Sequence, residues 1–504
     1  MSHAPTSHPT PDGTPASTPS SSLEDVLERI NRLANQSSVG PPPAPPPAAN
    51  DPSSAEPKKS PTLPQGSSAI HRPQDDRFRW TEDANEPIIP AEPKSLEHAG
   101  LSESIVEEIV ARLLLSRGEM TGRGIADHLK LPFRLVEPVL SRLKMQQLTV
   151  YAGSTAMNDY IHVLTDAGRD RARRHLLKTT YFGAAPVPIE HYIRSVQLQS
   201  IESQHPTRED LKRAFADLLI PDDLLNRLGP AINSGRGMFL YGYPGNGKTS
   251  IAERVTKSFG QYIWIPRAVL VDGEVMRFFD PLNHEESPVR EADGLLRDNN
   301  VDHRWVRIRR PTIVAGGELT MSMLEIARSP ETNISEAPLQ LKSNCGVLLI
   351  DDFGRQRMSV DELLNRWIVP LEKRYDYLSM SSGKKMQVPF NQLVIFSTNL
   401  QPKDLVDDAF LRRIPYKIEV PNPSEEHFRK LFEIMARVLK IPYRQEMVEY
   451  LIAKHYKPVG RHFRNCHPRD LLLQIRSYCL FNGAPQQMTE ETVDFAVDNY
   501  FSIM

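Results

Sequence analysis

The chain has 504 residues, too many for one small domain, so its length predicts two to four folded units. Its 61 Lys and Arg residues nearly balance 63 Asp and Glu residues. The resulting net charge of −2 excludes a global basic field that would attract nucleic acid or membranes. The three cysteines form no Cys-x-x-Cys pair and predict neither a disulfide framework nor a zinc site. No apolar run approaches a membrane span and no signal-peptide core is found, so we expect a cytoplasmic protein.

Residues 1–95 are rich in Pro, Ser, Thr and Ala. Such a segment buries too little apolar surface to offset its ordering entropy, so we expect a disordered arm. Within it, residues 22–36 place five apolar side chains on one helical face: Leu23, Val26, Leu27, Ile30 and Leu33. Two interpretations remain open, a transient helix without a role and a helix that docks in a groove of a partner.

Residues 98–178 have a different pattern. Helical spacing is found over residues 102–116, 121–129 and 131–146, and strand-like runs follow at 148–151 and 160–164. Three helices, a hairpin and a Leu-Thr-x-x-Gly-Arg sequence at 164–169 resemble the winged-helix domains of bacterial regulators. This resemblance implies a winged helix-turn-helix domain.

The charge of this domain leaves its partner open. Between residues 98 and 178 there are 12 Lys and Arg residues against 9 Asp and Glu residues, a net charge of only +3. The candidate recognition helix offers Arg134, Arg142 and Lys144 but also Glu137. Because phosphate neutralisation supplies most DNA affinity, DNA readers usually concentrate more positive charge there. DNA binding therefore stands beside a protein-docking or inter-subunit role.

After an expected linker at 179–205, two helices lead into a short apolar strand at 238–241. The strand runs into Gly-x-x-x-x-Gly-Lys-Thr at 242–249 and then into an amphipathic run. Strand, glycine-rich loop and helix in this order predict a nucleoside-triphosphate site, with the N–H groups of residues 245–250 converging on phosphate oxygens. Lys248 is expected to contact the β- and γ-phosphates, and the Thr249 hydroxyl to hold Mg²⁺. The predicted ATP-binding residues in this loop are Gly242, Pro244, Gly245, Asn246, Gly247, Lys248, Thr249 and Ser250.

Strand-like segments separate this loop from the next motif. Residues 262–271 and 274–279 flank Asp272-Gly273, a strong two-residue hairpin turn. Residues 305–314 predict a further strand. Added hairpins on a rigid core are common places to engage a partner, and we favour that interpretation over simple capping of a sheet edge.

A continuous apolar run at 346–350 predicts a strand buried on both faces, and it ends in Asp351 and Asp352. A triphosphate bridged by a metal needs an acid at the tip of a strand near the phosphate loop, so Asp351 is expected to hold the Mg²⁺ shell together with Thr249. A second acid beside it polarises the attacking water, which is the role expected of Asp352.

Another buried strand at 392–397 ends in Thr398 and Asn399. The sequence Ala-Phe-Leu-Arg-Arg follows at 409–413. Helical patterns then cover residues 424–440, 445–456, 468–480 and 490–501.

Over residues 205–504 the order of motifs resembles the AAA+ ATPases. The resemblance rests on Walker A at 242–249, Walker B at 346–352, a sensor-1 Asn, the 409–413 box and His-Pro-Arg-Asp-Leu at 467–471. It implies an α/β fold, a P-loop doubly wound parallel sheet over residues 206–421 with a C-terminal helical lid over 422–504. It also implies ATP and Mg²⁺ between core and lid, and a homo-oligomeric ring, commonly a hexamer.

The resemblance also implies roles for polar residues outside the phosphate loop. Asn399 would position the attacking water or the γ-phosphate. Arg412 or Arg413 would reach into the site of the neighbouring subunit, and Arg469 would act on the nucleotide from the lid. The predicted catalytic residues are therefore Asp352, Asn399, Arg412 and Arg413.

One feature departs from the family. Its Walker B usually ends in Asp-Glu, whereas this chain has Asp351 and Asp352. Aspartate is one methylene shorter, which indicates slower hydrolysis. The Asp-Asp-Phe-Gly sequence is similar to that of transposition-helper and helicase-loader AAA+ proteins, which act on nucleic acid and tolerate the acid pair, so we still expect hydrolysis.

These observations predict an ATP hydrolase that remodels a protein or nucleoprotein partner recruited by the winged helix and the N-terminal arm. The alternative is a DNA-binding regulator or loader in which ATP is an assembly switch. A scaffold that binds ATP without turnover is the third possibility.

Overall fold

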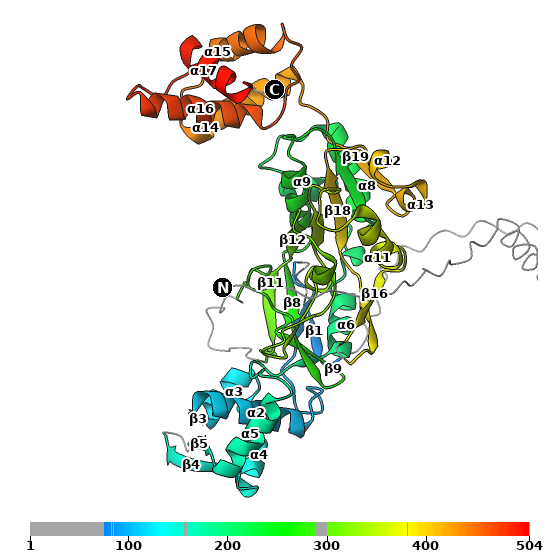
Figure 1. Cartoon of the computed structure of the whole chain (residues 1–504), viewed down its shortest axis with the longest axis vertical. Coiled ribbons are helices and arrows are strands. Elements are labelled where there is room, and N and C mark those ends of the chain that lie inside the picture. The colour runs from blue at the N-terminus through cyan, green and yellow to red at the C-terminus, as the bar shows by residue number, and fades with distance from the viewer. Residues whose placement is uncertain are drawn as a thin grey trace, which may run out of the picture. The chain divides into compact units, whose positions relative to one another are not determined.

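The computed structural model describes residues 75–502 except residues 82, 84, 156–158, 289–299 and 381 (Figure 1). All described residues belong to one compact unit, Pro73–Met504. The Pro- and Ser-rich segment up to residue 74, with the helix expected at 22–36, lies outside them. No helix among the described residues is both long and apolar enough to cross a lipid bilayer.

Residues 75–95 differ from the disordered arm expected there. Strands β1 (Phe78–Trp80) and β2 (Ile88–Pro90) pair in antiparallel orientation. The prediction of disorder up to residue 95 is wrong for this stretch, because its apolar side chains pack against Trp264 and Trp305 in one buried cluster.

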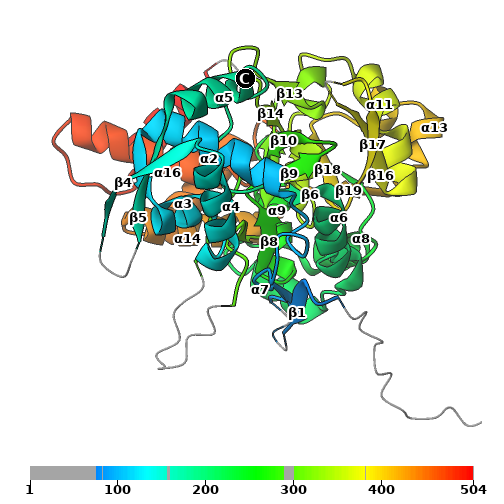
Figure 2. The same cartoon turned by 90° about the horizontal axis from the view of Figure 1, so that it is seen from below.

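Residues 103–176 form four helices and a three-stranded antiparallel sheet of order β3-β5-β4. Figure 2 shows the helices α2 to α5 together with β4 and β5. The elements are α2 (Glu103–Arg117), β3 (Glu119–Thr121), α3 (Gly122–Leu129), α4 (Phe133–Met145), β4 (Thr149–Ser154), β5 (Tyr160–Leu164) and α5 (Asp166–Leu176). The hydroxyl of Thr121 starts α3 by accepting a 3.0 Å hydrogen bond from the backbone N–H of Gly124. The apolar inner faces of the helices share one core.

The expected linker at 179–205 contains a packed helix, α6 (Ile189–Leu198). Its buried face includes Tyr192, whose hydroxyl donates a 3.1 Å hydrogen bond to the carbonyl of Leu341. The segment is therefore part of a folded layer, because helical spacing places apolar residues on its inner face.

The hairpin turn predicted at Asp272-Gly273 is confirmed, but the strand-like run at 262–271 is divided at Arg267 and only residues 268–271 of that run belong to the hairpin. Strands β9 (Ala268–Val271) and β10 (Glu274–Arg277) pair in antiparallel orientation across the turn, and both turn residues have positive φ, 48° and 82°. This hairpin belongs to a five-stranded sheet of order β13-β14-β10-β9-β6. The other strands of that sheet are β6 (Val187–Pro188), β13 (Ala327–Arg328) and β14 (Ser335–Glu336).

The prediction of a single strand at 305–314 is wrong. The chain forms β11 (Trp305–Arg309), which pairs with β8 (Tyr262–Pro266), and β12 (Thr312–Ala315), which joins a different sheet. The break falls at Arg310 and Pro311. The buried guanidinium of Arg310 donates a 2.7 Å hydrogen bond to the carbonyl of Gly260 and also bonds the carbonyl of Cys345.

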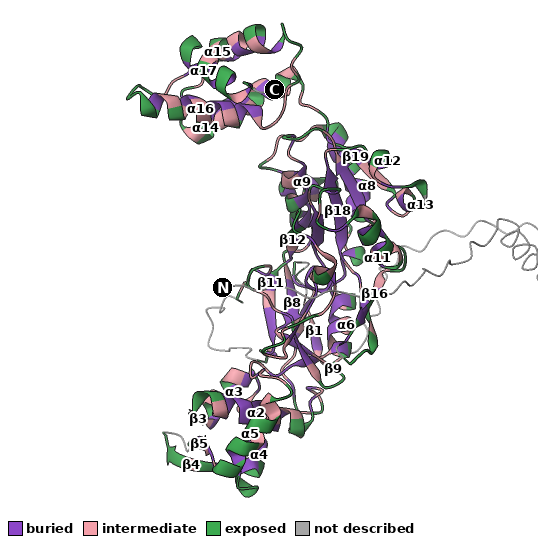
Figure 3. Ribbon diagram, in the orientation of Figure 1, coloured by how far each residue is buried: buried purple, intermediate pink, exposed green. Residues whose placement is uncertain are grey.

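The central sheet is parallel and has the order β12-β15-β18-β7-β19. Its strands β7, β15 and β18 are mostly buried on both faces, as the continuous apolar runs predicted (Figure 3). Apolar residues on the two faces form two cores. The elements are β7 (Met238–Tyr241), β15 (Val347–Ile350), β18 (Leu393–Thr398), β19 (Tyr416–Glu419), α7 (Arg208–Ala214), α8 (Asp222–Asn233), α9 (Lys248–Val255), α10 (Leu339–Lys342), α11 (Val360–Lys373), α12 (Pro402–Leu405) and α13 (Asp408–Leu411).

A separate two-stranded ribbon, β16 (Tyr375–Ser379) and β17 (Lys385–Pro389), lies between α11 and β18 in the chain. The C-terminal helices lie where their periodicity predicted and share one apolar core. They are α14 (Glu425–Leu439), α15 (Gln445–Leu451) with a π-helical extension to residue 456, α16 (His467–Phe481) and α17 (Glu490–Tyr500).

Candidate functional site

The carboxyl ends of the five parallel strands lie at one edge of the central sheet, because all five run in the same direction. Within this sheet, the strand that follows β7 in the chain is β12, at the far edge. β15 and β18 then lead back toward β7, and the last strand, β19, lies on the other side of β7. The strand order therefore reverses at β7. In open α/β sheets this reversal is where ligands bind.

The glycine-rich loop between β7 and α9 occupies this position. Three of its glycines have positive φ, namely 138° at Gly242, 82° at Gly245 and 84° at Gly247. Helix α9 begins at Lys248 with Gly247 as its N-cap, and no side chain caps its first backbone N–H groups. These donors and the positive end of the helix dipole suit phosphate oxygens.

The Lys248 side chain is folded back over the loop. Its ammonium donates hydrogen bonds to the carbonyls of Gly242 and Tyr243, at 3.0 and 3.1 Å, and to Oδ1 of Asn399 at 2.7 Å. Burial lowers the pKa of Lys248, and the carboxylates of Asp351 and Asp352 oppose this shift. The ammonium is therefore partly desolvated and lies beside two acids.

A second contact joins α9 to the acidic strand end. The Thr249 hydroxyl donates a 2.8 Å hydrogen bond to Oδ2 of Asp351. Hydroxyl and carboxylate oxygens are hard donors that suit Mg²⁺, which takes few protein ligands and completes its shell with water and phosphate. No cluster of three or more His, Cys, Asp or Glu residues that could hold a metal occurs in the described part of the chain. Thr249 and Asp351 thus fit a metal that is held jointly with phosphate.

Asp352 and Asn399 face each other beside this pair. Asn399 Nδ2 lies 3.4 Å from Oδ1 of Asp352. Phe353 fixes the loop between them, because its N–H donates to the carbonyl of Ser397 at 2.7 Å and its carbonyl accepts from the Thr398 hydroxyl at 3.0 Å. Asp352 is exposed and has a positive φ of 48°. Its carboxylate is thus available to a water molecule.

The structure does not bring the predicted arginines to this cluster. The exposed side chain of Arg469 forms a 2.9 Å ion pair with the adjacent Asp470. Arg413 lies 3.5 Å from a carboxylate oxygen of Glu372. Arg412 is exposed, and no ion pair to it is found within the described residues.

Sequence reasoning missed other residues at the phosphate loop. Arg464 and Asn465 donate hydrogen bonds to loop carbonyls, and the buried amide of Asn246 donates a 2.8 Å hydrogen bond to Oδ1 of Asn422. Asn422 follows β19, so the shared edge of the parallel strands was a signal that could have found it. Arg464 and Asn465 precede the 467–471 box but follow no pattern of their own.

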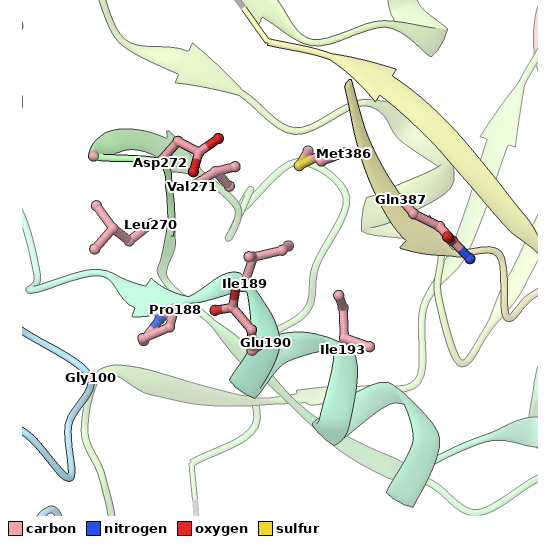
Figure 4. Close-up of a pocket in the computed structure, with 11 residues that line it drawn as sticks. Gly100, Pro188, Ile189, Glu190, Ile193, Leu270, Val271, Asp272, Met386 and Gln387 are labelled. Atoms are coloured by element: carbon pink, nitrogen blue, oxygen red, sulfur yellow. The ribbon is translucent and has the colours of Figure 1, made fainter. Parts of the chain in front are cut away.

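An open pocket of about 410 Å³ lies elsewhere in the structure, and none of its lining residues belongs to the phosphate loop (Figure 4). It is lined by α6, the β9–β10 turn, β17 and Gly100, with Ile189, Ile193 and Met386 among its apolar residues. The pocket is therefore separate from the phosphate-loop site.

A family described as a domain of unknown function (DUF8689) matches residues 424–499, which span the C-terminal helices. No curated protein matches the chain. The strand order and the polar residues at the strand ends are consistent with the AAA+ fold that the sequence resembles.

Solved structures with some likeness include a mutant RuvB of Thermotoga maritima, with 14% identity and a TM-score of 0.32 over 61% of this chain and 74% of that chain. The T. maritima RuvB Holliday junction branch migration motor has 13% identity and a TM-score of 0.33, over 57% and 73%. NtrX from Brucella abortus has 12% identity and a TM-score of 0.37, over 56% of each chain. Likenesses this low do not bear on function.

Proposed function

We propose that this chain is a Mg²⁺-dependent ATP hydrolase of the AAA+ class, with its core at residues 206–421 and a helical lid at 422–504. The observation that supports it most is the pair of hydrogen bonds from Lys248 to Asn399 and from Thr249 to Asp351. These join a glycine-rich loop to two neighbouring strand ends at the point where the strand order reverses.

In this proposal each polar group has one task. Lys248 and the loop N–H groups bind the phosphates, and Thr249 and Asp351 hold Mg²⁺, which supplies neutralisation of the developing charge. Asp352 orients the attacking water and accepts its proton. Asn399 holds the side chains of Asp352 and Lys248 in place relative to each other. Catalysis is then positioning and charge stabilisation by preorganised groups.

Equilibrium binding of Mg²⁺-ATP tests this assignment. Lys248→Ala removes the buried ammonium, and we expect it to abolish measurable binding or weaken it at least about 100-fold, as for a charge-assisted contact to phosphate. Lys257→Ala is the matched control, because Lys257 is exposed and lies beyond the end of α9. Equal affinity of Lys248→Ala and wild type would refute the proposed site.

We also propose that the active form is a homo-oligomeric ring in which Arg412 acts on the neighbouring site. Two observations support Arg412 over Arg413. The side chain of Arg413 is only partly exposed and is paired with Glu372, whereas the side chain of Arg412 is exposed on a turn after α13. A group that acts in a second subunit must project from its own.

For the unit at residues 98–178 we propose a winged helix that binds a protein rather than duplex DNA. The cations of the candidate recognition helix are engaged within the chain. Arg134 forms a 2.6 Å ion pair with Glu92, Arg142 pairs with Glu103, and the Lys144 ammonium lies 3.6 Å from the centre of the Tyr151 ring. These contacts reduce the positive charge that the helix offers to DNA phosphates.

The same surface exposes apolar side chains. Met145, Val150 and Tyr160 are among the exposed large hydrophobic residues, and Tyr160 stacks on Tyr151 with ring centres 4.2 Å apart. Exposed apolar and aromatic groups at the end of α4 and on the β4–β5 hairpin favour a protein partner. The alternative, a DNA-binding loader with ATP as an assembly switch, loses support from these contacts.

Binding of duplex DNA measured at about 50 and 200 mM salt distinguishes a protein-binding unit from a DNA-binding one. We expect no affinity that depends on salt, and no difference when Arg134, Arg142 and Lys144 are all changed to Ala. An affinity that falls steeply with salt and vanishes in this triple variant would instead support the DNA-binding alternative.

A further inference from the structure

Three consecutive carbonyls of the phosphate loop accept hydrogen bonds from residues 464–466, which belong to the C-terminal helices of residues 422–504, here called the C-terminal unit. Arg464 Nη1 donates to the carbonyl of Pro244 at 3.0 Å, and Asn465 Nδ2 donates to that of Asn246 at 2.9 Å. The backbone N–H of Cys466 donates to the carbonyl of Gly245, also at 2.9 Å. The contact is therefore made to the backbone of the loop.

The peptide groups involved are the ones expected to bind phosphate. Each carbonyl shares a peptide plane with the N–H of the next residue, so residues 244–246 supply the carbonyls and residues 245–247 the N–H groups. Hydrogen bonding at one end of a peptide group polarises it and strengthens the bond at the other end. A ligand on the N–H groups therefore strengthens the hold of the C-terminal segment on the carbonyls.

Side chains reinforce this contact. The Arg464 guanidinium lies 5.4 Å from the centre of the Tyr243 ring. The imidazole of His462 stacks on the same ring, with ring centres 6.1 Å apart. At Gly245 a Cβ atom would overlap Sγ of Cys466, so only glycine permits this approach. The buried Asn246 amide also donates a 2.8 Å hydrogen bond to Oδ1 of Asn422, the first residue of the C-terminal unit.

We propose that Arg464, Asn465 and Cys466 are positioning residues that couple phosphate binding to docking of the C-terminal unit through the three shared peptide groups. The inference rests on the proposed nucleotide site. In this proposal the C-terminal residues contact the carbonyl oxygens of the loop, whereas the phosphates contact its N–H groups. Coupling is reciprocal, so nucleotide tightens docking by the same factor by which docking tightens nucleotide binding.

Cys466 reports on this contact directly. It is half-buried against the loop, whereas Cys345 and Cys479 are buried in the cores. A maleimide should therefore react with Cys466 whenever the segment leaves the loop, and the site of labelling is identified by mass spectrometry of the peptides. We expect a non-hydrolysable ATP analogue with Mg²⁺ to slow labelling of Cys466 at least about fivefold, which corresponds to the lower end of ordinary coupling energies.

Asn465→Ala removes one of the three bonds and leaves the phosphate-facing side of the loop unchanged. In this variant we expect the analogue to slow labelling of Cys466 by less than half the factor seen in the wild type. Binding of the analogue should weaken by a similar factor. Asn482→Ala is the matched control, since Asn482 is exposed on the same unit and, among the described residues, its side chain bonds only to the carbonyl of Tyr478. The control should behave as the wild type.

The outcomes separate this inference from the function on which it rests. If the analogue binds to the wild type but leaves the labelling rate of Cys466 unchanged, the coupling is wrong and the nucleotide site stands. Full protection in Asn465→Ala would overturn it as well. If the wild type does not bind the analogue at all, the proposed function fails and the inference fails with it.

Discussion

Oδ1 of Asn399 accepts a 2.7 Å hydrogen bond from the ammonium of Lys248, and the Nδ2 atom of the same amide lies 3.4 Å from Oδ1 of Asp352. One side chain thus stands between the residue proposed to bind phosphate and the residue proposed to orient water. The amide is suited to this place because it accepts at one end and donates at the other.

Asn399→Ala should therefore lower kcat more than it weakens ATP binding. The substitution frees Lys248 and Asp352 from their shared partner, and we expect kcat to fall about 100-fold, as when one preorganised donor is removed from an active site. KM should change less than about threefold, since Lys248 still reaches the phosphates. Steady-state kinetics checks this. Gln401→Ala, an exposed neighbour, should leave both constants unchanged, and a loss that appears only in KM would argue against the positioning role.

Asp352 carries a second prediction, which follows from its backbone. Its φ of 48° lies in the left-handed region, which Asp and Asn tolerate better than Glu. Asp352→Asn keeps this conformation and removes the charge, so we expect kcat to fall by about 100-fold or more with ATP affinity intact.

Asp352→Glu is the companion variant. It restores the residue usual in the family but in a backbone conformation that disfavours it, so turnover should not exceed that of the wild type. A Glu variant that is clearly faster, at unchanged stability, would show that side-chain reach rather than backbone geometry limits hydrolysis.

The two neighbouring arginines are predicted to differ. Arg412→Ala should abolish the rise of specific activity with protein concentration that a shared active site produces. Arg413→Ala should keep this rise and lose about 0.5 kcal/mol or less of stability, because the ion pair with Glu372 is partly exposed. Activity measured across a range of protein concentrations decides between them, and the reverse pattern would assign the action on the neighbouring site to Arg413.

His467, at the start of α16, predicts a dependence of stability on pH. Burial, together with Arg464 and Arg461, lowers its pKa from 6.5 to about 4. The unfolded chain therefore binds more protons between these pH values, and the free energy of unfolding falls as the pH is lowered from 6.5 toward 4 by at most about 1.4 kcal/mol per pH unit. His191 has a lowered pKa of about 4 as well and adds to the slope with the same sign.

His467→Gln should remove the share of this slope that belongs to His467, and its acceptor keeps a partner for the hydroxyl of Tyr456, which lies 2.9 Å from Nδ1. Calorimetric melting of the wild type and the variant between pH 7 and pH 5 measures the difference. Parallel curves would show that His467 titrates alike in the folded and unfolded chains.

Much of the fold could be read from periodicity. The buried strands of the central sheet and the C-terminal helices lie where continuous apolar runs and helical spacing predicted. The errors occur where tertiary partners decide. Residues 305–314 look like one strand in the sequence. However, Pro311 lacks an N–H, and the buried Arg310 bonds to the carbonyls of Gly260 and Cys345. The chain therefore changes sheets at these two residues. The strands at 78–80 and 88–90 exist because Trp264 and Trp305 cover them.

The candidate site shows the same division. Lys248, Thr249, Asp351 and Asn399 could be placed together from sequence, because each follows a parallel strand and the carboxyl ends of such strands share an edge. Arg464 and Asn465 could not, since they contact the loop through its backbone carbonyls, which leave no mark in side-chain patterns. Whether the grouped residues act as proposed remains a prediction.

The central claim is that this edge of the sheet hydrolyses ATP. Its most direct test is release of inorganic phosphate from ATP by the full chain with and without Mg²⁺, for the wild type and for Thr249→Ala, which removes the hydroxyl bonded to Asp351. We predict turnover that requires Mg²⁺ and falls at least about 100-fold in the variant. Turnover that is equal in the two proteins, or that persists without Mg²⁺, would contradict the account.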